Sequence, residues 1–227
     1  MKTIFLLPLF PSFFVTTLGT PFRNLDFESA KVGATREPVV NTTDAVPGWS
    51  VVVGNQPLTT MLFNGFCQTC PSASINDADL LGMGKFTVGM TAGTVPGSSP
   101  PVLLSTSLYQ TGDVPRDAHS LQFVANVGPT LDLFHVFLGG QELALVRQEP
   151  VGFGYRFGAD VTTWAGKTTE LRFTIEPGSA PFYGSAGLDG IRFSPDVLVT
   201  VPEPSTWTLL GVGGGLLFWV ARRPKAK

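Results

Sequence analysis

The segment ELRFTIEP, residues 170–177, has the clearest periodicity in the sequence. Apolar and polar residues alternate along it, with Leu171, Phe173 and Ile175 on one face and Glu170, Arg172, Thr174 and Glu176 on the other. Because successive side chains of a β-strand point to opposite faces, this pattern predicts a strand with one buried and one solvated face. Such a strand requires a sheet that packs against a hydrophobic core.

Several other short segments have strand character. SLQFVANV, residues 120–127, places Leu121, Phe123, Ala125 and Val127 on one face. Two apolar runs, 131–138 and 141–146, flank Gly139-Gly140, which is the signal of a two-residue hairpin. Further strands are expected in NLDFESA (24–30), GWSVVVG (48–54), KFTVGM (85–90) and LDGIRFSP (188–195).

The composition agrees with an all-β fold. The 227 residues include 26 glycines and 19 prolines, which interrupt helices and favour turns. Residues 31–48 and 91–101 have the composition of loops, and residues 54–85 that of irregular chain. About six to nine short strands, with turns between them and no long helical period, predict a β-sandwich or jelly roll.

The N-terminal end differs from the middle of the chain. Residues 1–19 begin with a lysine, continue with an apolar run and end in small residues, which is the pattern of a cleaved secretory signal peptide. A permanent membrane anchor is the alternative, but Pro8 and Pro11 interrupt its helix. The expected organisation is a signal peptide at 1–19, a β-sandwich domain at 20–197 and a distinct C-terminal segment at 198–227.

Charge separates the domain from the tail. Residues 20–201 contain 10 Lys and Arg against 16 Asp and Glu, a net charge of −6, whereas the last six residues contain four positive charges. An acidic domain lacks the basic surface that nucleic-acid binding requires, so no nucleic-acid partner is expected.

Cys67 and Cys70 are the two cysteines of the chain. The oxidising compartment that an exported protein enters favours a disulfide between them. Free thiols, a redox pair and half of a zinc site are the alternatives. The polar, loop-like residues after Pro71 do not predict the helix N-terminus that activates a redox cysteine, and a zinc site needs two further ligands.

The C-terminal segment reads VPEPSTWTLLGVGGGLLFWVARRPKAK, residues 201–227. Residues 205–221 carry no charge, and a helix of that length spans about 26 Å, close to the lower limit for a bilayer core. Arg222 and Arg223 favour a cytoplasmic C-terminus, so the domain faces the periplasm or beyond. The prolines hold Pro202-Glu203-Pro204 in an extended stretch just outside the membrane.

This tail resembles the PEP-CTERM sorting signal of Gram-negative bacteria. The resemblance lies in a short motif, an apolar helix and the basic Arg222-Arg223, with the motif formed by Val201, Pro202, Glu203, Pro204 and Ser205. It implies recognition by an exosortase, a transient stay in the inner membrane, and a final position at the cell surface or in an extracellular matrix. Such proteins are often linked to exopolysaccharide.

The domain itself resembles the galactose-binding-like jelly rolls of many PEP-CTERM proteins, in NLDFE, a GW turn, LYQTGDVPRDAHSLQF, FGADVTTWAGKTTELRF and LDGIRF. The resemblance implies a structural calcium that ties the first strand to the last through Glu28 and Asp189. Gly190 stands where the family often has a second acid. No other cofactor is expected. Carbohydrate-binding modules share this fold, but a fold alone does not establish sugar binding.

The expected function is a structural or adhesive role at the surface, and carbohydrate binding is the alternative. Exposed aromatic rings could stack on sugars, and the candidates are Phe153, Tyr155 and Trp164, with Trp49, Tyr109 and Tyr183 considered beside them; each ring could equally serve the core. A secreted hydrolase would need Asp117, His119 and Ser120 to converge, but their sequence context lacks a nucleophile elbow. No catalytic residue is assigned, and the protein is expected not to be an enzyme.

Overall fold

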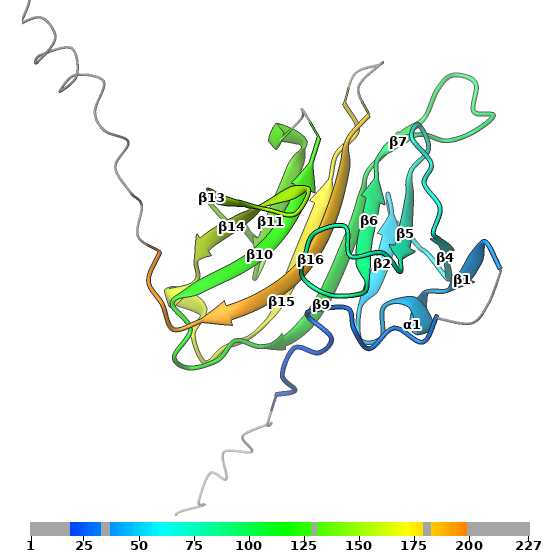
Figure 1. The fold of residues 1–227 in the computed structure, drawn as a ribbon. Helices are drawn as coiled ribbons and strands as arrows, with labels where there is room; N and C mark the ends of the chain where they lie inside the picture. The colour runs from blue at the N-terminus through cyan, green and yellow to red at the C-terminus, as the bar shows by residue number, and fades with distance from the viewer. Residues whose placement is uncertain (1–18, 33–36, 129–130, 179–182, 199–227) are drawn as a thin grey trace, which may run out of the picture.

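The computed structural model describes residues 19–32, 37–128, 131–178 and 183–198. These residues form mainly β-strands in two large sheets, which confirms the all-β prediction (Figure 1). The helical elements are short: α1 spans Thr42–Ala45, η1 spans Leu131–Leu133 and η2 spans Thr162–Trp164.

The larger sheet has eight strands in the order β1-β4-β5-β6-β16-β10-β14-β13. The bounds in that order are Val39–Asn41, Thr60–Phe63, Ser72–Asn76, Thr87–Thr91, Ser185–Ser194, Ser120–Val127, Gly154–Asp160 and Val146–Val151. All neighbouring pairs are antiparallel except β4 and β5, which run parallel.

The smaller sheet has six strands in the order β12-β11-β15-β9-β2-β3. Their bounds in that order are Gln141–Glu142, Phe134–Leu138, Thr168–Ile175, Thr106–Asp113, Ser50–Val53 and Gln56–Pro57. A separate two-stranded ribbon pairs β7, Gly93–Thr94, with β8, Leu103–Leu104.

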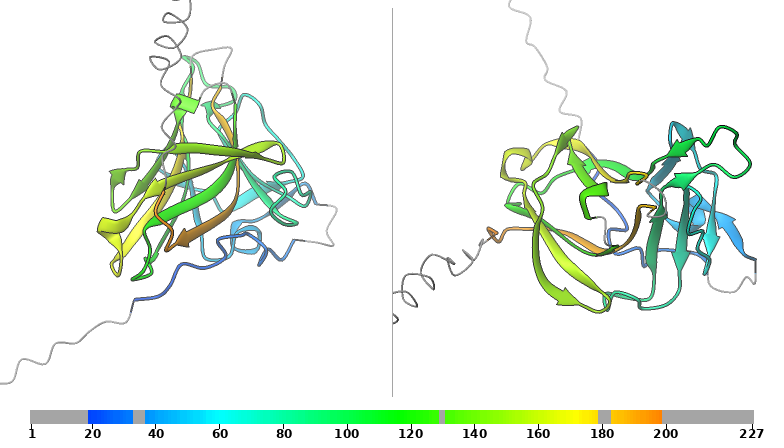
Figure 2. Two further views of the ribbon diagram at one scale, coloured as in Figure 1. Left: turned by 60° about the vertical axis from the view of Figure 1, so that its left-hand side comes forward. Right: turned by 90° about the horizontal axis from the view of Figure 1, so that it is seen from above.

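The two sheets face each other across one hydrophobic core (Figures 1 and 2). Phe123 of β10 and Phe173 of β15 meet there edge to face, with ring centroids 5.3 Å apart. Phe157 stacks on Phe123 from β14, and Trp49 reaches Phe173 from the start of β2. The longest strands alternate between the sheets along the chain, so the core closes only when both sheets are assembled.

The strand predicted from ELRFTIEP is confirmed as β15. Leu171, Phe173 and Ile175 are fully buried on its core face, as the alternation predicts. The predicted hairpin is confirmed as well, because β11 and β12 flank Gly139 and Gly140. Both glycines have positive φ, 62° and 77°, which is the backbone that this tight turn requires.

The predicted first strand at 24–30 is wrong, because these residues form turns. The Asn24 side chain accepts a hydrogen bond from the Ser29 N–H at 2.9 Å, and the Asp26 side chain accepts one from the Glu28 N–H. Phe27 has φ of 59° and is fully buried. Asn and Asp side chains that bind nearby backbone compete with strand pairing, which explains the difference.

The segments expected to be loops are also more ordered than predicted. Residues 31–48 contain β1 and α1, residues 54–85 contain β3, β4 and β5, and residues 91–101 contain β7. The strand β9, which has no apolar alternation, was not predicted either. Its buried hydroxyls find partners across the fold: Thr106 donates to the Thr91 carbonyl at 2.6 Å, and Ser107 lies 2.9 Å from Thr174 Oγ1.

No helix in the described part of the chain is long and apolar enough to cross a membrane. The predicted span at 205–221, the sorting motif and residues 1–18 of the predicted signal peptide lie outside the described residues. The fold therefore does not test those predictions.

Candidate functional site

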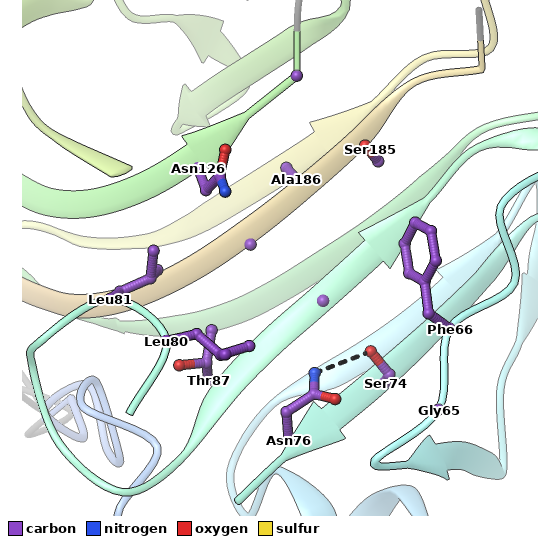
Figure 3. A pocket seen from close by; sticks show the side chains of 13 residues that line it. Gly65, Phe66, Ser74, Asn76, Leu80, Leu81, Thr87, Asn126, Ser185 and Ala186 are labelled. Atoms are coloured by element: carbon purple, nitrogen blue, oxygen red, sulfur yellow. Dashed lines mark hydrogen bonds between the residues drawn. The ribbon is translucent and has the colours of Figure 1, made fainter. Parts of the chain in front are cut away.

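A groove of about 330 Å³ lies on the face of the larger sheet that points away from the core (Figure 3). We call it the outer-sheet groove. The strands β5, β6, β16 and β10 form its floor, and the segments around Phe66 and Leu80 form its walls; it is lined by Gly65, Phe66, Ser74, Asn76, Leu80, Leu81, Thr87, Gly89, Asn126, Gly128, Ser185, Ala186 and Gly187. On each strand, the residues that flank these in sequence, such as Ile75 and Val88, point to the opposite face and belong to the core.

Two glycines lie at the centre of this floor. Gly89 of β6 and Gly187 of β16 are register partners, so two adjacent strands lack side chains at the same level. A Cβ atom at Gly89 would lie 2.5 Å from Ser74 Oγ, which is too close for any other residue without movement. Ser74 Oγ therefore occupies the position above Gly89, whereas a Cβ atom at Gly187 would meet nothing nearer than 3.8 Å, so the open part of the floor lies over Gly187.

Polar side chains surround the glycine pair. Asn76 Nδ2 donates to Ser74 Oγ at 3.3 Å, and Asn126 and Ser185 enter the groove from β10 and β16 (Figure 3). Thr87 is 2% exposed, and its hydroxyl has no hydrogen-bond partner among the described residues. Because the oxygen is closed off from solvent, a ligand in the groove could reach this hydroxyl only if the Thr87 side chain moved.

The walls of the groove are apolar and partly open to solvent. Phe66, in the loop after β4, is 62% exposed, and Leu80, in the β5–β6 loop, is 39% exposed. None of the lining residues carries a charge. An aromatic ring beside uncharged donors and acceptors suits a neutral ligand that has both an apolar face and hydroxyl groups.

The loop that carries Phe66 is closed by a disulfide. The structure joins Cys67 to Cys70, with their Cα atoms 5.5 Å apart. The Cys70 N–H donates to Cys67 Sγ at 3.2 Å, and the Thr94 N–H donates to the Thr69 carbonyl at 2.9 Å. These bonds hold the residues directly after Phe66 in place.

Of the three aromatic residues predicted to stack on sugars, Phe153 lies beside the groove. It occupies the tip of the β13–β14 hairpin and is 78% exposed. Its N–H donates to the Leu80 carbonyl at 3.3 Å, so the hairpin tip contacts the loop that forms one wall.

Tyr155 and Trp164 lie elsewhere. Tyr155 pairs in register with Ala125, a core residue, and its ring therefore lies on the inner side of the larger sheet. The Arg147 guanidinium covers that ring at 3.3 Å from its centroid. Trp164, in η2, packs against the core. The fold does not bring the three residues together.

The other aromatic residues considered from the sequence are also dispersed. Trp49 is buried and donates from Nε1 to the Asn24 carbonyl at 2.9 Å. Tyr109 of β9 lies under the Arg172 guanidinium, and Tyr183 lines a separate hollow beside Thr94.

Asp189, predicted as a calcium ligand, is fully buried at the β16 bulge. Its Oδ1 accepts the Gly190 N–H at 2.6 Å, whereas Oδ2 has no partner among the described residues. Burial raises the pKa of this carboxyl to about 7, and the negative charges of Glu28, Asp26 and Asp79 add to the rise. Glu28 Oε1 in turn accepts the Phe86 N–H at 2.9 Å.

The fit of this region to calcium is partial. The free Asp189 Oδ2 is one suitable oxygen, and the charge of Glu28 acts on the same carboxyl. However, no three His, Cys, Asp or Glu side chains in the described parts of the chain are arranged to hold a metal ion. Since calcium prefers six to eight oxygens, backbone carbonyls and water would have to complete the site.

Asp117, His119 and Ser120, the residues considered for a hydrolase, have different surroundings. Ser120 is fully buried, and its hydroxyl donates to the Asp196 carbonyl at 2.8 Å. His119 Nδ1 lies 3.5 Å from Thr162 Oγ1, and Asp117 is exposed.

Comparisons with known proteins identify the tail. The family model of the PEP-CTERM protein-sorting motif matches residues 200–224, which confirms the prediction for this segment. The motif indicates an exported protein that is sorted by exosortase in association with a membrane. No curated protein is significantly similar in sequence.

Among solved structures, the secreted serine protease VesC from Vibrio cholerae is similar at 14% sequence identity and a TM-score of 0.32. The match covers 58% of this chain and 26% of the protease, so this chain spans about a quarter of that protein. A similarity this low assigns neither a fold family nor an activity.

Sequence reasoning missed most of the groove, including Phe66, Thr87 and Asn126. One signal was present in the sequence: Gly89 and Gly187 interrupt segments that otherwise have strand character. Glycine inside a strand often marks a close approach by a ligand or another backbone.

Proposed function

We propose that this protein is an adhesive component of the cell surface or extracellular matrix, and that its β-sandwich domain binds a saccharide in the outer-sheet groove. The observation that carries the proposal is the uncharged lining, which combines the exposed Phe66 ring with the polar side chains of Asn76, Asn126 and Ser185. Sugars present an apolar ring face and neutral hydroxyls, and both would find counterparts here.

A binding assay tests the groove. The full-length chain in detergent is applied to an array of neutral and acidic glycans, and affinities for the best ligand are then measured for two variants. Phe66→Ala should weaken binding about fivefold, since an aromatic contact contributes roughly 1 kcal/mol. Tyr155→Ala, on the other side of the sheet, should bind as the wild type does. If Phe66→Ala binds equally well, the groove is not the site.

The sorting part of the proposal concerns the tail. The segment 205–221 holds the protein in the inner membrane with a cytoplasmic C-terminus, and an exosortase-like enzyme recognises Pro202-Glu203-Pro204 and releases the domain. Mass spectrometry of the surface protein should find its C-terminus near Pro204 or Ser205. Surface material that still ends at Lys227 would contradict release.

Three further parts of the proposal are each supported by one observation. The alternation of long strands between two sheets supports a jelly roll. The engaged Ser120 hydroxyl supports a role without catalysis. The free Asp189 Oδ2 supports a structural calcium that ties the turn around Glu28 to β16.

A further inference from the structure

The outer-sheet groove is longer than a single sugar needs. It crosses β5, β6, β16 and β10, which are four adjacent strands. At the usual spacing of neighbouring strands, this is a length of about 14 Å. The groove therefore runs across the sheet, perpendicular to the strands, with Ser74 on β5 and Asn126 on β10 at its two sides and the glycine pair between them.

An exposed phenylalanine lies at one end of this groove and another lies just beyond the other end. Phe66 follows β4, the neighbour of β5, and Phe153 lies at the tip of the β13–β14 hairpin, next to β10. Their exposed fractions, 62% and 78%, are the two largest among the aromatic residues described. Leu80 lines the groove, and its carbonyl binds the Phe153 N–H.

The position of Phe153 is fixed by close backbone packing. A Cβ atom at Gly152 would lie 2.6 Å from the Leu81 carbonyl carbon, so the hairpin and the β5–β6 loop touch without an intervening side chain. Gly82, in the β5–β6 loop, lies against Gly152, with 3.8 Å between the Gly152 nitrogen and the Cβ position at Gly82. The hairpin tip therefore extends the wall of the groove.

The charge of the domain favours a neutral ligand over an acidic one. The groove lining has no charged side chain, and residues 20–201 carry a net charge of −6. A negatively charged surface repels polyanions, so acidic polysaccharides are disfavoured.

We propose that the groove binds an internal stretch of a neutral polysaccharide chain, with Phe66 and Phe153 contacting sugar units at its two ends. This inference rests on the proposed saccharide-binding function and adds the form of the ligand. Binding several units of a chain at once suits an adhesive matrix component, because one molecule of polymer can then engage many copies of the protein.

The test measures affinity against ligand length. The full-length chain in detergent is titrated with neutral gluco- and galacto-oligosaccharides of one to six units and with oligogalacturonates of the same lengths. Affinity for a neutral series should rise at least tenfold between one and four units, and the acidic series should bind more weakly. Phe153→Ala should abolish the rise with length but keep the affinity for the monosaccharide, whereas Phe66→Ala should weaken both. Tyr155→Ala, on the same hairpin, is the matched control.

The outcomes separate this inference from the proposed function. Affinity that does not depend on length, or a Phe153→Ala variant that binds long chains as the wild type does, overturns the chain-binding proposal and leaves the groove as a site for single sugars. Preference for the acidic series overturns the neutral class. Absence of binding to every glycan overturns both proposals. Circular dichroism of each variant checks that the loss does not come from unfolding.

Discussion

Among the described residues, Asp189 accepts one hydrogen bond, at Oδ1, and none supplies a partner to Oδ2. It lies below the β5–β6 loop, since a Cβ atom at the next residue, Gly190, would meet the Met83 side chain. Its pKa of about 7 follows from burial first and from neighbouring carboxylates second. An aspartate in this state is destabilising when charged, so its presence indicates a proton or a cation as partner.

The pH dependence of stability should report this group. Because the pKa is raised from 3.8 to about 7 on folding, the folded state binds more protons between these values. The free energy of unfolding should therefore fall as pH rises from 4 to 7, by up to about 4 kcal/mol from this group. In chelator, Asp189→Asn should be more stable than the wild type at pH 8 and similar at pH 4, as measured by urea unfolding.

Calcium provides the control for that experiment. If a cation is the natural partner, millimolar calcium should raise the stability of the wild type at pH 8 and leave Asp189→Asn unchanged. Equal effects on both proteins would argue against a calcium bound at this carboxyl. If the wild type instead gains stability between pH 4 and 7, a partner in the folded protein already stabilises the charged form of Asp189.

At the scale of elements, the strands differ in how well local sequence predicts them. β15 alternates cleanly because one face meets the core, while Glu170 and Arg172 on the other face are partly exposed. β9 buries both faces, and Thr106, Ser107 and Gln110 are among its buried residues, so its pattern carries no such signal. The turn at 24–30 has strand-like alternation, yet its Asn and Asp side chains bind the backbone instead. Local patterns fail where hydrogen bonds from distant or adjacent side chains decide the structure.

The contact between the β13–β14 hairpin and the β5–β6 loop can be tested at Gly152. Gly152 has φ of 53°, and Gly140, in the β11–β12 turn, has φ of 77° with open space around it. Alanine at either site has the cost of a left-handed backbone, about 1 kcal/mol. Gly152→Ala should be destabilised by about 1–2 kcal/mol more than Gly140→Ala in urea unfolding, because its methyl group meets the Leu81 backbone.

Binding measurements on Gly152→Ala and Gly140→Ala distinguish a loss of affinity from a loss of stability. Gly152→Ala should lose affinity for long oligosaccharides only, since displacement of the hairpin moves Phe153 away from the groove. Gly140→Ala should keep the affinity of the wild type for every length. Identical destabilisation of the two variants would mean that the hairpin tip does not pack on Leu81 in solution.

At the scale of the whole molecule, the groove exists because distant segments become neighbours in one sheet. Ser74, Gly89, Asn126 and Gly187 come from four strands that span more than half of the chain, and their order in the sheet is not their order in sequence. The tail is the opposite case, since its motif, apolar run and basic end are contiguous. Release by an exosortase-like enzyme would leave the domain, with its groove, as the part that acts at the surface.

The sequence alone determined the all-β class, the best strands and the sorting tail. Each of these depends on residues that are close along the chain, where periodicity or a linear motif carries the information. The tertiary structure alone decided which exposed aromatic residues lie beside a groove, that Phe66 is among them, and that Asp189 is buried with a free oxygen. Those features depend on strand order and burial, which arise from long-range pairing that no local pattern encodes.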